Sequence, residues 1–260
     1  MTPQELRRLS AAGEFHKPTA GYCDGYVQAN LLAVPSDYAD AFEQFCRNNP
    51  KPCPLLEKVG PGNHFTSYLS DGANLLNTIP RYLIWENGQI INEVEDISEH
   101  YRNDLVFFLL GCSFSFEEAL VKSGIALRHL AQKKNVAMFN TTLALQSSGP
   151  FSGNMVVSMR LIHRSLVAQA CAITAHYPKV HGEPVHVGYP ELIGIDDLAK
   201  PDYGEPVEIK NEEIPVFWAC GVTPQNVLIQ SKVSFAITHA PGYMFVSDRK
   251  NTEYFQCVYQ

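Results

Sequence analysis

The sequence predicts an α/β protein with a mixed sheet, flanking helices and two interleaved subdomains. Three observations support this class. Apolar strand-like runs alternate with short helical segments along the 260 residues. A hydrophobic content of 45% is typical of a globular protein. The chain contains no low-complexity segment and no repeat of the length found in solenoids. We expect one domain over 1–260, with tentative subdomains 1–120 plus 210–260 (an α/β sandwich) and 121–209 (a smaller α+β part).

The first half of the chain has clear start and stop signals. A short helix is expected at 5–12, and a second helix begins at Ser36 as its N-cap and ends before Pro50. "PRYLIWENGQIINEV" predicts a hairpin, because Asn87-Gly88 suits a type I′ turn. The polar stretch 96–105 is expected to be helical and to lead into the buried strand "LVFFLL".

The second half continues the alternation of strands and helices. We expect strands at 154–161 and 214–220, helices at 164–177 and 224–232, and a hairpin over 233–248 around His239. Residues 181–206 are rich in Gly and Pro but contain Ile193 and Ile195, so we expect an ordered loop.

Composition excludes several classes of protein. The net charge of −7 and the lack of any run of four basic residues argue against a nucleic-acid partner. Apolar runs reach only about seven residues, too short to span a membrane, and the first residues have no secretory apolar segment. Seven scattered cysteines indicate neither a disulfide framework nor a zinc site. We therefore expect a cytoplasmic protein without a metal.

One strand-to-helix corner carries candidate binding groups. In "GCSFSFEEAL" (111–120), Ser115 and Glu118 fit a capping box, and Glu117 lies where the helix dipole favours negative charge. The corner is either only a helix cap, or a cap whose amides near Cys112, Ser113 and Ser115 also bind a carboxylate or an oxyanion.

A second corner repeats this pattern. In "PVFWACGVTPQ" (215–225) an apolar strand again ends in Cys220 next to Gly221, and Thr223 with Pro224 begins a helix. The two corners are expected side by side at the ends of neighbouring strands, where open α/β sheets bind ligands. Either cysteine is eligible as a nucleophile, although buried cysteines more often only pack.

Other polar residues have two readings each. Arg160 ends an apolar strand. It is either a surface residue or a residue whose guanidinium group binds a carboxylate through two N–H donors. His181 and His186 are hydrogen-bonding loop residues or a zinc pair, and His239 is structural or catalytic.

Several segments together resemble one known family. The segments "YVQANL", "FCRNNPKPCPLL", "GCSFSFE", "VVSMR", "HGEPVHVG", "FWACGVTPQ" and "ITHAPGYM" occur in the order found in the D-glutamate cyclase family. The resemblance covers about residues 15–248, with one departure: Thr78 stands where the family pattern has Asp. The resemblance implies a hydro-lyase that converts D-glutamate to 5-oxo-D-proline and water without a cofactor.

The same resemblance suggests roles for the candidate residues. Arg160 would bind a substrate carboxylate, and the amides near Ser113 and Ser115 would hold the oxyanion, with Cys112, Gly221 and Thr223 also lining the substrate site. Glu117, His181, His186 and His239 are the candidates for proton transfer. The alternatives are a non-catalytic protein that binds an acidic amino acid or 5-oxoproline, and a lyase for another small carboxylic acid. Homo-oligomers remain possible within this reading.

Overall fold

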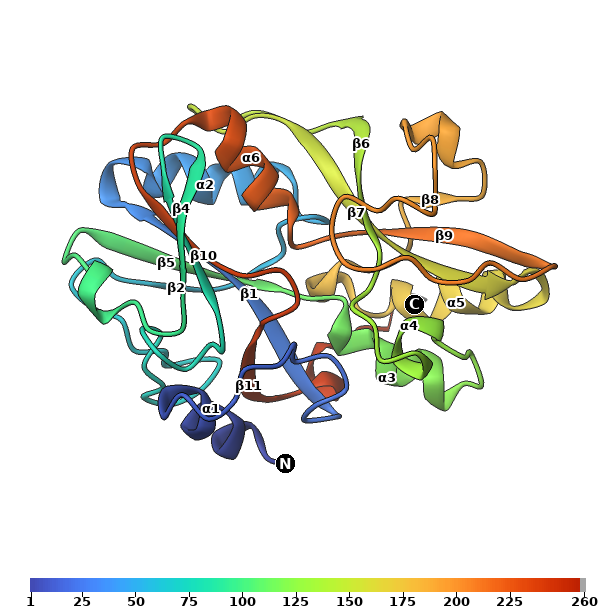
Figure 1. Ribbon diagram of the computed structural model, residues 1–260, viewed down its shortest axis with the longest axis horizontal. Coiled ribbons are helices and arrows are strands. Elements are labelled where there is room, and N and C mark those ends of the chain that lie inside the picture. Colours follow the sequence, from blue (N-terminus) through green and yellow to red (C-terminus); the bar gives the residue numbers. More distant parts are fainter. Residues whose placement is uncertain (258–260) are drawn as a thin grey trace.

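Two antiparallel β-sheets form the centre of the molecule (Figure 1). The computed structural model describes residues 1–257. The larger sheet has the order β2-β5-β1-β10-β3-β4, and β11 also pairs with β1. Its strands are β1 (Tyr26–Pro35), β2 (Leu55–Val59), β3 (Tyr82–Glu86), β4 (Gln89–Val94), β5 (Leu105–Gly111), β10 (Ala236–His239) and β11 (Phe245–Lys250). The smaller sheet has the order β6-β7-β9-β8. Its strands are β6 (Met138–Ala144), β7 (Asn154–His163), β8 (His186–Val187) and β9 (Glu213–Ala219).

Helices cover both sheets (Figure 1). They are α1 (Pro3–Ala11), α2 (Ser36–Asn48), α3 (Phe114–Lys122), α4 (Arg128–Ala131), α5 (Val167–Ala175) and α6 (Thr223–Ser231). Short 3₁₀ helices lie at Ser98–His100, Arg164–Leu166, Pro178–Val180, Pro190–Ile193 and Asn251–Tyr254. None of the helices in the described part of the chain is long and apolar enough to cross a membrane.

The larger sheet is buried on both faces, which explains its continuous apolar strands. All seven residues of β5 are buried. Phe108 packs on one face with Phe42 of α2, whereas Phe107 packs on the other face with Leu75 and Ile79. An apolar run without alternation is therefore the expected sequence for β5.

The smaller sheet places Arg160 on a defined face. Arg160 of β7 pairs with Val216 of β9, and the Val216 face packs against α3 and α5 together with Trp218. Phe217 and Met159 lie on the opposite face, under Ile193 and Ile195 of the loop 181–206. The prediction that this loop is ordered is confirmed.

The predicted class is confirmed, since strands and flanking helices alternate in two sheets. The hairpin of β3 and β4 is also confirmed, with positive φ angles of 49° at Asn87 and 79° at Gly88. The subdomain boundary stays a prediction. Strand β9, which that prediction places with the outer part, pairs with β7 in the smaller sheet.

Three local predictions are wrong. Residues 96–105 contain only the 3₁₀ turn Ser98–His100 instead of a helix. Residues 233–248 do not form a hairpin, because β10 and β11 both pair with β1 at successive positions. Ser36 is the first residue of α2, and the N-cap is Pro35.

Candidate functional site

The two corners meet at the junction of the sheets, through Asn30 of β1. Asn30 Nδ2 donates a hydrogen bond to the Gly111 carbonyl at 2.7 Å. A Cβ at Gly221 would lie only 2.0 Å from the same nitrogen. Gly221 is therefore needed so that the second corner can approach Asn30. The corners follow β5 and β9, which belong to different sheets and are not neighbouring strands of one sheet, as the sequence suggested.

Equivalent hydroxyl groups fix both corners. Ser115, three residues after Cys112, accepts a hydrogen bond from the Gln28 amide of β1 at 3.0 Å. Thr223, three residues after Cys220, accepts one from the Val156 amide of β7 at 3.0 Å. In each corner the hydroxyl connects the first turn of a helix to a neighbouring strand: β1, which lies beside β5, and β7, which lies beside β9. The similarity seen in the sequence therefore extends to the hydrogen bonds.

The predicted capping roles of these hydroxyls are wrong, because both hydroxyls bond to the amides of neighbouring strands instead. The N-cap positions are Ser113 for α3 and Val222 for α6, and neither cap residue makes a side-chain capping bond. The amides of Ser115 and Phe116 donate to the carbonyls of Cys112 and Ser113. Of the amides expected to bind an anion at this corner, those of Ser115 and Phe116 are thus already used within the turn.

The two corner cysteines are buried free thiols. Burial raises the pKa of Cys112 far above its usual range, against the opposing effect of the Phe114 amide. Burial also raises the pKa of Cys220 to about 11, although the Val222 amide and the charge of Arg160 lower it. Since the thiolate is the nucleophile, both environments favour packing over catalysis.

Arg160 is a fully enclosed cation. Its side chain is 1% exposed, and its guanidinium carbon lies 5.4 Å from the ring centroids of both Phe116 and Trp218. Nη1 donates to Ser158 Oγ at 2.7 Å, and Nη2 donates to Ser113 Oγ at 2.9 Å. A direct role in binding a substrate carboxylate stays a prediction, and it requires the guanidinium to give up one of these partners.

The counter-ion of Arg160 is Glu117 of α3. Arg160 Nη2 and Nε donate to Glu117 Oε1 at 2.5 and 3.1 Å. His129 Nε2 of α4 lies 3.1 Å from the same oxygen. Burial by itself would raise the pKa of Glu117, but the charges of His129 and Arg160 outweigh it and lower the pKa to about 2. Glu117 is therefore a buried carboxylate held in its ionised form.

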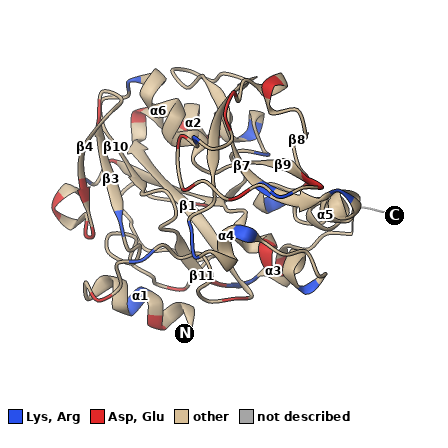
Figure 2. Cartoon of the chain, turned by 45° about the vertical axis from the view of Figure 1, so that its right-hand side comes forward, with Lys and Arg blue, Asp and Glu red and all other residues tan. Residues whose placement is uncertain are grey.

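Neither His129 nor Asn30 is among the residues that sequence patterns singled out. Figure 2 shows α4 beside α3, and it is His129 of α4 that lies against Glu117 of α3. Helix α4 has only four residues and no recognisable motif, so no local signal indicates its partner. Asn30 had a usable signal, because it is a polar residue inside the buried run "YVQANL".

The other predicted histidines lie in three different surroundings. His181 is completely buried next to the first corner, donates from Nδ1 to the Lys51 carbonyl at 2.7 Å, and has a positive φ of 86°. Burial is the largest effect on its pKa and lowers it to about 4. The side chain thus has the neutral form at neutral pH. Its Nε2 atom is buried without a hydrogen-bond partner among the described residues.

His239 and His186 do not join Glu117. The Nδ1 atom of His239 lies 3.1 Å from both the amide nitrogen and the carbonyl oxygen of Leu31, and burial lowers the pKa of His239 to about 4. His186 pairs with Phe217 in β8 and β9, so it lies on the face of the smaller sheet opposite to Arg160. Catalytic roles for these two histidines stay predictions, and neither histidine contacts the cluster formed by Glu117, Arg160 and His129, called the Glu117 cluster below.

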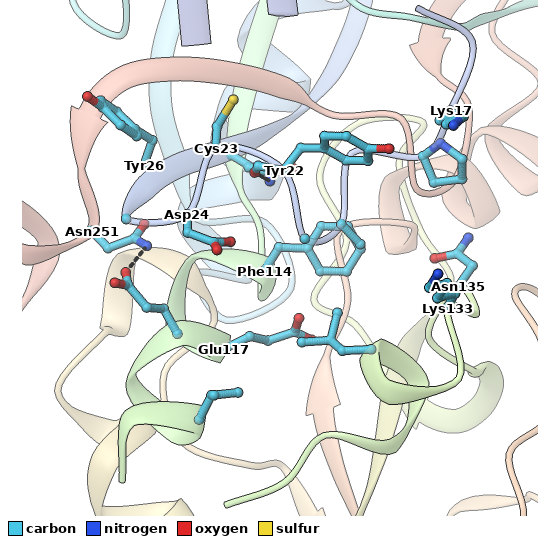
Figure 3. Close-up of a pocket in the computed structure, with 18 of the residues that line it drawn as sticks. Lys17, Tyr22, Cys23, Asp24, Tyr26, Phe114, Glu117, Lys133, Asn135 and Asn251 are labelled. Atoms are coloured by element: carbon cyan, nitrogen blue, oxygen red, sulfur yellow. Dashed lines mark hydrogen bonds between the residues drawn. The ribbon is translucent and has the colours of Figure 1, made fainter. Parts of the chain in front are cut away.

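A cavity of about 830 Å³ lies beside Glu117. The segment Lys17–Tyr26 and helix α3 contribute much of its wall. Figure 3 shows Lys17, Lys133 and Asn135 on one side of the cavity, Asp24 and Asn251 on the other, and Glu117 below Phe114. Glu117 lines this cavity whereas Arg160 and His129 lie buried behind it, so Glu117 is the residue of the three that borders space for a ligand.

Thr78 lies elsewhere. Its hydroxyl donates to the Asn74 carbonyl at 2.5 Å, and it lines a separate pocket of about 330 Å³ with Arg7 and Arg8. The departure at Thr78 therefore does not alter the cavity beside Glu117.

Comparisons with known proteins identify the family. The model of the D-glutamate cyclase family matches residues 106–248. A protein of Stutzerimonas stutzeri named "Putative hydro-lyase" is 49% identical over 253 residues, which cover 97% of this chain and 96% of that protein. The chain belongs to the D-glutamate cyclase family.

Further relatives agree with this assignment. Two proteins whose printed names also begin with "Putative hydro-lyase", from Xanthobacter autotrophicus and Staphylococcus haemolyticus, are each 47% identical to this chain. Both alignments cover 97% of this chain, and they cover 92% and 97% of those proteins. The family resemblance is confirmed, and the names support a lyase of the hydro-lyase type. A nitrogen repressor-like protein from Methanococcus jannaschii superposes with a TM-score of 0.39 at 10% identity over 96% of this chain and 99% of that one, a likeness too low to support an argument.

Proposed function

We propose that this protein cyclises D-glutamate to 5-oxo-D-proline and water in the cavity beside Glu117. The family assignment supports a hydro-lyase. The observation that carries the proposal is the ionised carboxylate of Glu117, which lines the cavity and touches both Arg160 and His129.

The charges of the cavity match those of glutamate. Glutamate has two carboxylates and one ammonium group. Lys17, Lys133 and Asp24 line the cavity, and within residues 1–257 no ion pair uses any of the three side chains. The two lysines would bind the carboxylates, while Asp24 and Glu117 would attract the ammonium group.

Holding both ends of glutamate favours the bent conformer that ring closure needs. Because the reaction is intramolecular, a fixed near-attack geometry replaces a bimolecular encounter. The amine nitrogen forms a bond to the γ-carboxyl carbon, and one carbon–oxygen bond breaks. Two protons leave the ammonium nitrogen and both end on the departing oxygen, which becomes water.

Glu117 and His129 would divide the proton transfer. A carboxylate with a pKa near 2 is a weak base, so Glu117 suits the binding of a cation better than the removal of a proton. An imidazole is the side chain best suited to move protons near neutral pH. His129 does not line the cavity itself, so it would act from behind Glu117 Oε1, which lies 3.1 Å from its Nε2, giving a proton to the leaving oxygen and recovering one from the amine.

Replacement of His129 by Gln tests this assignment. Removing the proton carrier should lower kcat by roughly 10²–10⁴ with a smaller change in KM. Lys133→Ala should raise KM for D-glutamate, because it removes a carboxylate contact at the cavity wall. Chiral chromatography of 5-oxoproline measures turnover, and urea unfolding checks that each variant is folded. A folded His129→Gln protein with full turnover would contradict the role of His129.

Substrate controls separate the proposal from its rivals. L-glutamate should react far more slowly, because the cavity fixes both carboxylates and then presents the amine of only one enantiomer. Chelation and desalting should leave turnover unchanged if the reaction needs no cofactor. If the wild type binds D-glutamate but forms no product at neutral or alkaline pH, it is a binding protein for an acidic amino acid.

A further inference from the structure

The cavity beside Glu117 has more room than free glutamate requires. Its volume of about 830 Å³ is in the upper part of the range of about 300–1,000 Å³ found for sites that enclose drug-sized ligands. Glutamate has about ten non-hydrogen atoms, which occupy at most about 300 Å³ if each takes the volume of a water molecule. More than half of the cavity would remain unfilled.

Only one position of the substrate can extend into this room. Ring closure consumes the amine and the γ-carboxyl group, so both must be free. The α-carboxyl group takes no part in bond making or breaking. Any larger substrate of the same reaction must therefore be extended at the α-carboxyl group.

The distribution of charge favours an extension that ends in an anion. Lys17 and Lys133 lie together on the side of the cavity away from Asp24 (Figure 3), and neither side chain has an ion-pair partner in the described part of the chain. Lys134 lines the same wall, and its Nζ donates to the Pro206 carbonyl. A peptide bond at the α-carboxyl removes one negative charge, but the carboxyl terminus of the peptide restores it further out.

The walls between these charges suit a peptide. Tyr22, Tyr26 and Val121 line the cavity, and Val121 of α3 is 49% exposed although it is apolar. An apolar side chain that borders a cavity without being covered is available to contact a ligand. A peptide segment would cover Val121 and still reach the lysines.

We infer that the site accepts short peptides that begin with D-glutamate, a conclusion that rests on the proposed cyclisation. The γ-carboxyl carbon of the first residue is attacked by its own amine, the new carbon–nitrogen bond closes the ring, and one oxygen leaves as water with two protons from nitrogen. The product is a 5-oxo-D-prolyl peptide. No oxidant, reductant or activating group is needed.

The test compares three substrates of the wild-type protein: D-glutamate, its α-amide, and the dipeptide D-glutamyl-glycine. The dipeptide should have a kcat/KM at least equal to that of D-glutamate, because it keeps two carboxylates and fills more of the cavity. The α-amide should be at least tenfold poorer than the dipeptide, since it lacks the second anion. Mass spectrometry follows the loss of water from each compound.

Two variants locate the extension. Lys133→Ala should reduce the advantage of the dipeptide over the α-amide, and Val121→Trp should slow the dipeptide more than D-glutamate by occupying the extra room. The matched control is Lys232→Ala, because Lys232 is exposed and does not line the cavity. It should change neither the kcat/KM of the dipeptide relative to the α-amide nor that of the dipeptide relative to D-glutamate.

The outcomes distinguish this inference from the proposed function. Turnover of D-glutamate with a dipeptide more than tenfold poorer overturns the inference and leaves the cyclase proposal in place. Turnover of the dipeptide alone supports the inference and removes free D-glutamate as the substrate. If none of the three compounds loses water, both proposals fail.

Discussion

Glu117→Gln is expected to destabilise the protein by about 3–5 kcal/mol, the usual cost of removing one partner of a buried ion pair. The variant keeps the size of the side chain but removes its charge. Arg160 would then be a buried cation between Phe116 and Trp218 without a counter-ion, since only neutral acceptors would remain: the new amide oxygen and the hydroxyls of Ser113 and Ser158. The perturbation therefore tests whether the Glu117–Arg160 pair stabilises the junction of the two sheets.

The lowered pKa gives a second value for the free energy that the ionised Glu117 carboxyl contributes to folding. A carboxyl group whose pKa falls from its ordinary 4.5 to about 2 contributes about 3 kcal/mol to folding at neutral pH. Because the folded-state pKa is the lower one, this contribution is fully present above about pH 4.5. It is lost as the pH falls toward 2, so the difference between wild type and Glu117→Gln should shrink over that interval.

Urea unfolding at pH 7, 4 and 3 measures both effects. Glu118→Gln is the matched control, because Glu118 pairs with the exposed Lys122 and should contribute less than about 1 kcal/mol. The double variant Glu117→Gln with Arg160→Met should recover part of the stability by removing the uncompensated cation. Equal stability of Glu117→Gln and Glu118→Gln at pH 7 would refute the reasoning.

The remaining predictions concern the two corners. Cys112→Ser and Cys220→Ser should each cost about 1–3 kcal/mol in urea unfolding, because a buried thiol becomes a more polar hydroxyl, yet turnover should stay within a few fold. A stable Cys112→Ser protein that binds substrate but loses turnover by orders of magnitude would restore the cysteine nucleophile. Gly221→Ala should be destabilising by thermal melting, and Asn30→Ala in the same chain should recover part of the loss by removing the clash. If the second substitution adds to the first, the clash is not the cause. Thr223→Val should cost about 1–3 kcal/mol, since a buried amide of β7 loses its acceptor, and an unchanged urea midpoint would contradict that role.

The sequence was informative where local signals coincide with tertiary contacts. Both corners were found because an apolar run that ends in Cys and Gly before a helix is a local pattern. Glu117 and Arg160 were singled out separately, by the helix dipole and by a charge at a strand end. Their direct contact depends on how the two sheets meet, and no local pattern encodes that contact.

The misses have specific physical causes. The turn residues after His239 do mark a loop, but β11 then returns to β1 instead of β10, which a turn signal cannot indicate. His186 lies on the face opposite to Arg160 because it pairs with Phe217, while Arg160 pairs with Val216. A shift of one residue along β9 decides the face, and strand register is not evident from an irregular loop.

The most direct test of the central claim is the fate of oxygen in D-glutamate labelled with oxygen-18 at both γ-carboxyl oxygens. The wild-type protein should form 5-oxo-D-proline that retains one labelled oxygen, while the other appears in water, and His129→Gln should do so far more slowly. Labelled D-glutamate that binds but remains unchanged, with no label in water, would contradict the claim that this protein is a D-glutamate cyclase.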